Sequence, residues 1–280
     1  MSIAGGFENA PALGRSIGCD AIQIFTKNAN QWRARPIGED EPGRFKKSLQ
    51  ENDIRAVIAH DTYLINLASP DTALWKRSVA AFAEELTRCR ILGITLLVTH
   101  PGSHMGKGED YGISRVAEGL DAAFESAGAA ARGVRVLLEN TAGQGNGLGY
   151  RFEQLAGIIR RCSRKRRLGA CLDTAHMFAA GYDLRTPGAW KDTMRALEDA
   201  LGPGRLAAIH LNDSKKDLGS RVDRHDRVGR GAIGKQGFEG VLADPRVAGL
   251  PLILEVPGGM EAFKEDLALL RRLARRKPTS

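Results

Sequence analysis

Residues 54–60 read IRAVIAH, an apolar run that ends on a histidine, and the same form repeats along the chain. The further runs are LLVTH (96–100), VRVLLE (134–139), GACLD (169–173), LAAIH (206–210) and LILE (252–255). Each has the length and composition of a buried strand, and their last residues recur about one βα unit apart. The carboxyl ends of parallel strands in a barrel meet at one face. The runs therefore predict a (β/α) barrel with metal-binding side chains at one rim.

Helical patterns separate these strands. A first helix is expected over 7–18 and a charged one over 40–52, and longer patterns with apolar residues three or four positions apart lie near 75–92, 113–131, 152–163, 189–201 and 260–276. With AIQIF at 21–25, seven strands are expected, whereas a closed barrel of this class has eight. We predict an α/β fold, a (β/α)8 TIM barrel, whose first strand is largely missing because only Met1 to Ile3 precede the first helix.

The length and composition favour one domain over residues 1–280, with 271–280 as a flexible basic tail. The formal charge of +8 suits a polyanionic partner without identifying one. The four cysteines form no C-x-x-C pair, which argues against a disulfide framework or a thiolate zinc site. No signal peptide or membrane-spanning run is recognisable, so we expect a cytoplasmic protein with no membrane partner.

Three further positions extend the set of candidate metal ligands. Asp223 and His225 have D-x-H spacing, which points both side chains the same way in an extended segment. His176 follows Asp173 by three residues, where a turn brings the two together. Carboxylates and imidazoles together suit Zn²⁺ or Mn²⁺, and three divalent ions would give four carboxylates a net charge of about +2, which favours phosphoryl chemistry. GRGAIG at 229–234 matches a dinucleotide motif but follows no strand, so we interpret it as a tight loop.

Several longer motifs resemble the endonuclease IV family of apurinic/apyrimidinic DNA repair enzymes, almost from end to end. They are LENTAGQGNGLG (138–149), DTAHMFAAGYD (173–183) and HLNDSKKDLGSRVDRH (210–225), supported by HDTYLINL (60–67), HPGSH (100–104) and IFTKN (24–28). The resemblance implies a TIM barrel with three zinc ions. It also implies hydrolysis of the phosphodiester 5′ to abasic sites in double-stranded DNA, leaving a 3′-hydroxyl and a 5′-deoxyribose phosphate, with no protein partner.

The resemblance carries nine zinc ligands onto this sequence. One ion is expected at His60, His100 and Glu139; a second is shared by Glu139 with Asp173, His210 and Glu255; the third is expected at His176, Asp223 and His225. Glu139, which bridges two ions, is the predicted catalytic residue.

Side chains from loops at the barrel mouth are implied to contact DNA. Tyr63 and Leu64 match two wedge residues that enter the duplex, although without the resemblance a buried position would be the better prediction for both. Asn30, Gln31 and Arg33 are further expected DNA contacts; because Asn30 stands where many members have an arginine, that contact must weaken or pass to Arg33 or Arg35. Two alternatives stay open: a xylose-isomerase-like sugar isomerase or epimerase, and an inactive DNA-binding remnant caused by the missing strand.

Overall fold

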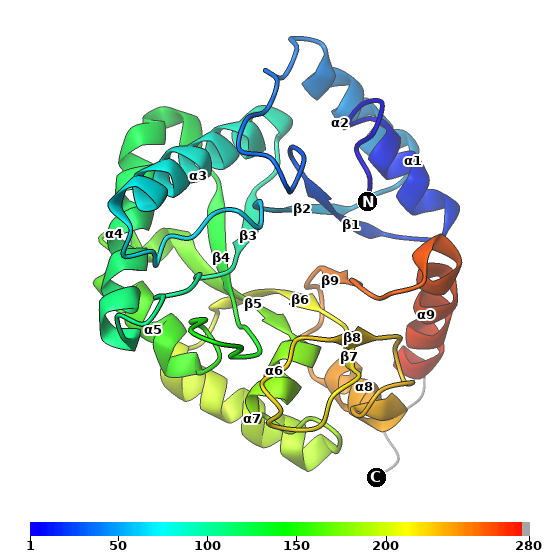
Figure 1. Cartoon of the computed structure of the whole chain (residues 1–280). Helices are drawn as coiled ribbons and strands as arrows, with labels where there is room; N and C mark the ends of the chain where they lie inside the picture. The colour runs from blue at the N-terminus through cyan, green and yellow to red at the C-terminus, as the bar shows by residue number, and fades with distance from the viewer. Residues whose placement is uncertain (276–280) are drawn as a thin grey trace.

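Seven parallel strands form one curved sheet in the computed structural model, which describes residues 1–275. The sheet runs in the order β1-β2-β3-β4-β5-β6-β9 and curls around a central axis, with helices outside it (Figure 1). The strands are β1 Ala21–Phe25, β2 Ala56–His60, β3 Leu96–Thr99, β4 Arg135–Glu139, β5 Leu168–Asp173, β6 Leu206–His210 and β9 Leu252–Ile253. The predicted TIM barrel with seven recognisable strands is confirmed.

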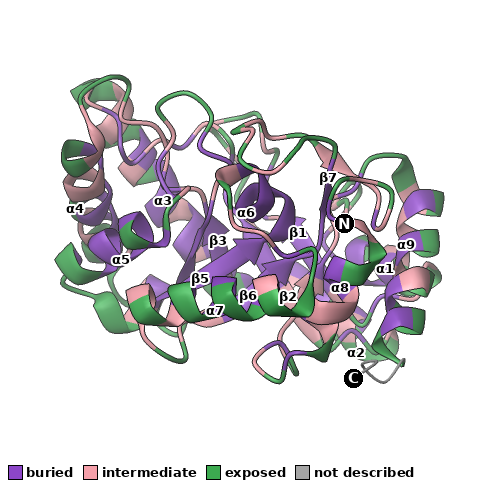
Figure 2. Ribbon diagram, turned by 90° about the horizontal axis from the view of Figure 1, so that it is seen from below, coloured by how far each residue is buried: buried purple, intermediate pink, exposed green. Residues whose placement is uncertain are grey.

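The outer layer is helical. Its members are α1 Asn9–Ser16, α2 Glu41–Glu51, α3 Thr72–Leu92, α4 Glu109–Ala127, α5 Phe152–Arg161, α7 Pro187–Leu201, α8 Gly234–Ala243 and α9 Gly259–Ala274, with 3₁₀ turns at Gly128–Ala131 and Lys165–Arg167. The short helix α6 Thr174–Ala180 directly follows β5 and is buried. Figure 2 shows the strands buried in the interior and the helices exposed on their outer sides. Among the described residues, none of these helices combines the length and apolar character needed to cross a membrane.

The alternation of side chains along the strands explains how the site is placed. A small buried cluster that includes Ile58, Val98, Leu137, Cys171 and Ile253 fills the interior of the barrel. In a strand, residues i and i+2 point to the same face. Each candidate ligand at the end of these strands lies two positions after one of these interior residues. The ligands therefore point inward and lie above the apolar plug.

The barrel is not closed by backbone hydrogen bonds, because β1 and β9 are the two ends of the sheet. Between them lies a cavity of about 520 Å³, lined mainly by apolar residues of β1, β9 and α9. The amino group of Met1 donates a hydrogen bond to the backbone oxygen of Gln23 at this opening, where Figure 1 shows the N-terminus. Met1 and Ser2 therefore line this opening.

Four segments differ from the sequence prediction. α6 was not expected, because TAHMFAA is short and almost wholly buried and so has no alternation of polar and apolar faces. α8 was not expected, because its sequence GKQGFEG is rich in glycine. A short hairpin, β7 Asp213–Ser214 and β8 His225–Asp226, folds the loop after β6. Residues 271–274, predicted as part of a flexible tail, belong to α9 instead, where Leu273 is buried; residues 276–280 of the predicted tail lie outside the described part of the chain.

Candidate metal centre

The nine predicted ligands meet at the carboxyl ends of the strands. Four of them are the last residue of a strand. One more directly follows β3, and another lies two residues past the end of β9. The remaining three lie in the first turn of α6 and in or beside the β7–β8 hairpin. They are, in that order, His60, Glu139, Asp173 and His210; His100 and Glu255; His176; and Asp223 and His225. Residues far apart along the chain thus become neighbours.

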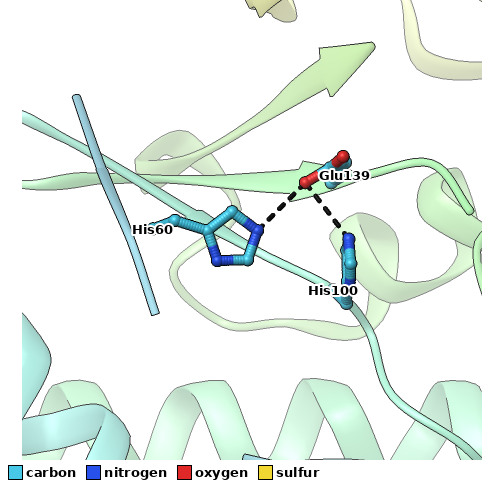
Figure 3. A group of neighbouring side chains, drawn as sticks. All are labelled: His60, His100 and Glu139. Atoms are coloured by element: carbon cyan, nitrogen blue, oxygen red, sulfur yellow. Dashed lines mark hydrogen bonds and ion pairs between the residues drawn. The ribbon is translucent and has the colours of Figure 1, made fainter. Parts of the chain in front are cut away.

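Glu139 lies at the centre of the cluster and is fully buried. Its Oε2 is 3.2 Å from His60 Nε2 and 3.3 Å from His100 Nε2, as Figure 3 shows. Its Oε1 is 3.0 Å from His210 Nδ1 and 3.4 Å from His176 Nδ1. One carboxylate therefore contacts imidazoles from four different parts of the chain.

Two other carboxylates extend the cluster on either side of Glu139. Glu255 Oε2 lies 3.3 Å from His210 Nδ1, and Asp173 Oδ2 lies 3.6 Å from His225 Nε2. Three sets of donor atoms, each set within 4.8 Å, could hold a metal ion: His60, His100 and Glu139; Glu139, Asp173, His210 and Glu255; and Asp173, His176 and His225. The first two sets are those expected from the sequence.

The third set contains Asp173 in place of the expected Asp223. Asp223 nevertheless lies beside it, since its carboxylate oxygens are 3.3 Å from His176 Nε2 and 3.4 Å from His225 Nε2. Its side chain is about half exposed, with an accessibility of 47%. Asp223 therefore covers the third set from the solvent side.

Backbone carbonyl groups orient three of the histidines. His60 Nδ1 lies 2.8 Å from the oxygen of Asp61, His176 Nδ1 lies 2.9 Å from that of Asn140, and His225 Nδ1 lies 3.0 Å from that of Glu255. A nitrogen that faces a carbonyl must donate its hydrogen, which leaves the Nε2 lone pair directed into the cluster. This outer contact is typical of metal-binding histidines.

His225 provides a separate test of whether the cluster fits a cation. Its Nε2 is buried and makes no hydrogen bond, although Asp173 and Asp223 lie within 3.6 Å. A buried polar atom without a partner is rare and costs free energy. A metal ion between this nitrogen and the two carboxylates would satisfy it, so the donor set fits a divalent ion.

The electrostatics of the cluster also favour cations. Burial alone would lower the pKa of His60, but the hydrogen bond and charge of Glu139 raise it to about 9. Burial would raise the pKa of Glu139, but His210 and His100 hold it well below its usual value. The contact with His176 lowers the pKa of Asp223 to about 2. The carboxylates are therefore ionised and need positive charge, which metal ions supply when they replace the protons of the imidazoles.

Polar residues behind the ligands were missed by the sequence prediction. Gln23 donates to Glu255 Oε1 at 2.6 Å and lies 2.8 Å from His210 Nε2. Asn212 donates to Asp173 Oδ2 at 2.5 Å, and its Oδ1 accepts from the backbone N–H of Glu255. The available signal was position: Gln23 is the single polar residue of AIQIF, and Asn212 lies two residues after a ligand.

The loop at 229–234 anchors the hairpin that carries His225. Asp213 accepts hydrogen bonds from the backbone N–H groups of Gly231, Ile233 and Gly234. A Cβ atom at Gly231 would lie only 2.3 Å from the backbone oxygen of Ser214, so no other residue fits there. The interpretation of this motif as a tight loop is confirmed.

The residues predicted to contact DNA lie around the same rim. Tyr63 is 62% exposed, so the alternative of a buried position is wrong for it, and its ring centroid is 6.1 Å from that of His60. Leu64 beside it is half-buried. The loop that follows β1 carries Asn30, Gln31 and Arg33.

Comparison with known proteins assigns the family. The model of the xylose isomerase-like TIM barrel family matches residues 11–273. A protein of Chloroflexus aurantiacus named probable endonuclease 4 is 48% identical over 276 residues, which cover 98% of this chain and 96% of that protein. The crystal structure of endonuclease IV from Thermus thermophilus superposes with a TM-score of 0.86 at 37% identity, over 98% of this chain and 96% of that one.

A sugar-modifying enzyme shares the fold at lower similarity. D-psicose 3-epimerase from Clostridium cellulolyticum superposes with a TM-score of 0.64 at 17% identity, over 97% of this chain and 91% of that one, which shows the common barrel alone. The two endonuclease matches have much higher sequence identity, 37% and 48% over nearly the full length, so they show the family as well as the fold. The chain belongs to the endonuclease IV family of apurinic/apyrimidinic endonucleases.

Proposed function

We propose that this protein hydrolyses the phosphodiester bond 5′ to abasic sites in double-stranded DNA, leaving a 3′-hydroxyl and a 5′-deoxyribose phosphate, with three Zn²⁺ ions as cofactors. The observation that supports this function best is the convergence of three donor sets that share Glu139 and Asp173. Shared carboxylates would hold neighbouring ions close together, as in multi-metal sites that stabilise both the attacking and the leaving oxygen of an in-line displacement at phosphorus.

The proposed ligands are those that the family resemblance implies, and Asp173 also lies close enough to His176 and His225 to contact the third ion. Glu139 would contribute to the ion held by His60 and His100 and to the ion held by Asp173, His210 and Glu255, and His176, Asp223 and His225 would hold the third ion. When bound, the ions would lower the pKa of water and neutralise charge on the phosphate and the leaving 3′-oxygen. The side chains of His100 and Asp223 are 34% and 47% exposed, so the phosphate would approach between them.

The surroundings of the cluster suit a distorted duplex. An exposed tyrosine next to a ligand can stack against a base or fill the space that a missing base leaves. Tyr63 has this position, with Leu64 beside it. Asn30, Gln31 and Arg33 would contact the strand on the β1 side of the rim. One domain would carry all these parts, since the strands of a single sheet bring them together.

The test combines metal content with cleavage. Purified protein reconstituted with zinc is analysed for metal per chain and incubated with a labelled duplex that holds one abasic analogue. We expect about three zinc ions per chain and a product whose 3′ end a polymerase can extend, with an intact duplex left uncut. One or two ions together with turnover of a ketohexose would favour the sugar isomerase.

The inactive remnant predicts a separate outcome. Such a protein would bind the abasic duplex, as measured by fluorescence anisotropy, yet leave it uncut under conditions in which the Thermus thermophilus enzyme cuts. A location in the cytoplasm is part of the proposal, and the four buried cysteines, all free, are compatible with a reducing compartment.

A further inference from the structure

The loop between β1 and α2 has an exposed side and an anchored side. We call residues 28–35 the recognition loop; it lies beside α3 near the barrel mouth (Figure 1). Gln31 and Arg33 are exposed, whereas Trp32 between them is half-buried under the guanidinium of Arg77, 4.3 Å from the ring centroid. The polar side chains thus face outward while the chain is held from behind.

A single arginine of α3 binds both ends of this loop. Arg88 is buried, and its Nη2 and Nε donate to the backbone oxygen and the hydroxyl of Thr26 at 2.5 and 3.1 Å. Its Nη1 donates to the backbone oxygen of Arg35 at 2.9 Å. The planar guanidinium therefore sets the distance between the two points at which the loop begins and ends.

A buried lysine fixes the middle of the loop. Lys27 Nζ donates to the backbone oxygen of Trp32 at 3.2 Å and to Glu84 at 3.0 Å, and lies 3.7 Å from Glu85. Glu85 in turn accepts a hydrogen bond from the hydroxyl of Thr26 at 2.6 Å. Lys27 thereby joins two carboxylates next to the loop, and the hydroxyl of Thr26 links Glu85 to Arg88.

The nature of these contacts indicates more than packing. Removing charged groups from water is costly, and hydrophobic residues of similar volume often serve stability as well. The charged side chains provide directional hydrogen bonds, because Arg88 and Lys27 donate to three backbone oxygens in and next to the loop. Such bonds fix the main chain and leave the outward side chains free to bind. Rigidity of this kind lowers the entropy lost on binding.

We propose that Arg88 and Lys27, supported by Glu84 and Glu85, form a clamp that preorganises the recognition loop for DNA. Arg88 and Lys27 are then positioning residues for substrate binding, with no part in the chemistry at the metal centre. This inference rests on the proposed function, because it takes DNA as the ligand of the loop.

The experiment compares variants of the zinc-loaded protein on the abasic duplex. Arg88→Ala should raise KM at least tenfold, leave kcat within a factor of two, retain the zinc content and make the bond after Arg33 sensitive to trypsin. Arg88→Lys keeps the charge but cannot span both loop ends, so it should recover part of the affinity. Arg90→Ala removes an exposed arginine from the same helix and should leave KM and trypsin resistance unchanged.

If Arg88→Ala fails to fold, Arg77→Ala provides a second test of loop rigidity. Arg77 is exposed, and it contacts the recognition loop through the ring of Trp32. This variant should also raise KM, to a smaller extent, and increase trypsin cleavage after Arg33. A fall in kcat at unchanged KM, or a loop that stays resistant to trypsin in both variants, would overturn the clamp. A wild-type protein that neither binds nor cuts the duplex would instead refute the proposed function, and the trypsin result would still test the clamp.

Discussion

Replacing Glu139 by glutamine tests the metal centre most directly. The amide keeps the size of the side chain and removes one negative charge from the point at which two donor sets meet. The Glu139 oxygens lie 3.0 to 3.4 Å from four imidazole nitrogens, so an ion held among these atoms would be within about 4 Å of the carboxylate. At this distance and an effective dielectric constant of about 20, one pair of unit charges contributes about 4 kcal/mol.

A divalent ion carries twice that charge, so the loss is at least about 4 kcal/mol, which corresponds to at least a roughly thousandfold weaker binding of each neighbouring ion. We therefore predict that Glu139→Gln loses at least one zinc per chain on dialysis and cleaves the abasic duplex at least a thousandfold more slowly, while it still binds the DNA. Metal content is measured by elemental analysis, and turnover and binding follow on the same sample. Glu118→Gln is the matched control, because Glu118 is exposed on α4. Full zinc content with near-normal turnover in the Glu139 variant would refute the ligand assignment.

Four further predictions follow from the rim, the cluster and the open edge. Tyr63→Ala should lose about 1–3 kcal/mol of its preference for abasic over intact duplex in anisotropy titrations, and Tyr63→Phe should keep it; equal preference in all three proteins would exclude a stacking role. Metal-free protein should melt at a lower temperature at pH 10 than at pH 7. The raised pKa of His60, about 9, gives stability that is complete below the unfolded value of about 6.5 and is lost as pH rises through 9, so a constant melting temperature would contradict the His60–Glu139 pairing. DNA affinity should fall steeply as salt rises, because phosphate contacts release counterions, and a flat response would argue against such contacts. Fusing a strand of alternating apolar residues ahead of Met1 should raise the melting temperature by filling the cavity between β1 and β9, whereas a polar fusion of equal length should not; identical melting curves would show that no strand enters there.

The strand ends could be predicted because they follow from local pattern alone. Each apolar run signals a buried strand, and parallel strands with helical crossovers must bring their carboxyl ends to one rim. Once His60, Glu139 and His210 are assigned to strand ends, their proximity follows without any knowledge of loop structure. The assignment of ligands to particular ions came from the family resemblance, and the donor sets of the structure agree with it except that Asp173 replaces Asp223 in the third set.

The contacts behind the ligands could not be predicted, because they depend on how the barrel curls. Gln23 and His210 are 187 positions apart, and no local pattern indicates that they touch. α8 was missed for a different reason: the glycines in GKQGFEG disfavour a helix, and packing of Phe238 and Val241 into the core overrides that preference. The clamp of the recognition loop also could not be predicted, because in the sequence Arg88 looks like any other charged residue of an amphipathic helix.

The open edge of the sheet does not displace the ligands, and the reason lies in Gln23. Its amide donates to Glu255 from the β1 side and faces His210, so side chains connect β1 to the far end of the sheet at the level of the cluster. Below this level, the two edges are separated by the apolar cavity of about 520 Å³. Closure at the rim is therefore achieved by polar side chains, whereas below the rim no backbone ladder joins β1 to β9 in the described residues. It follows that the open edge between β1 and β9 should affect the stability of the barrel more than the geometry of the metal centre.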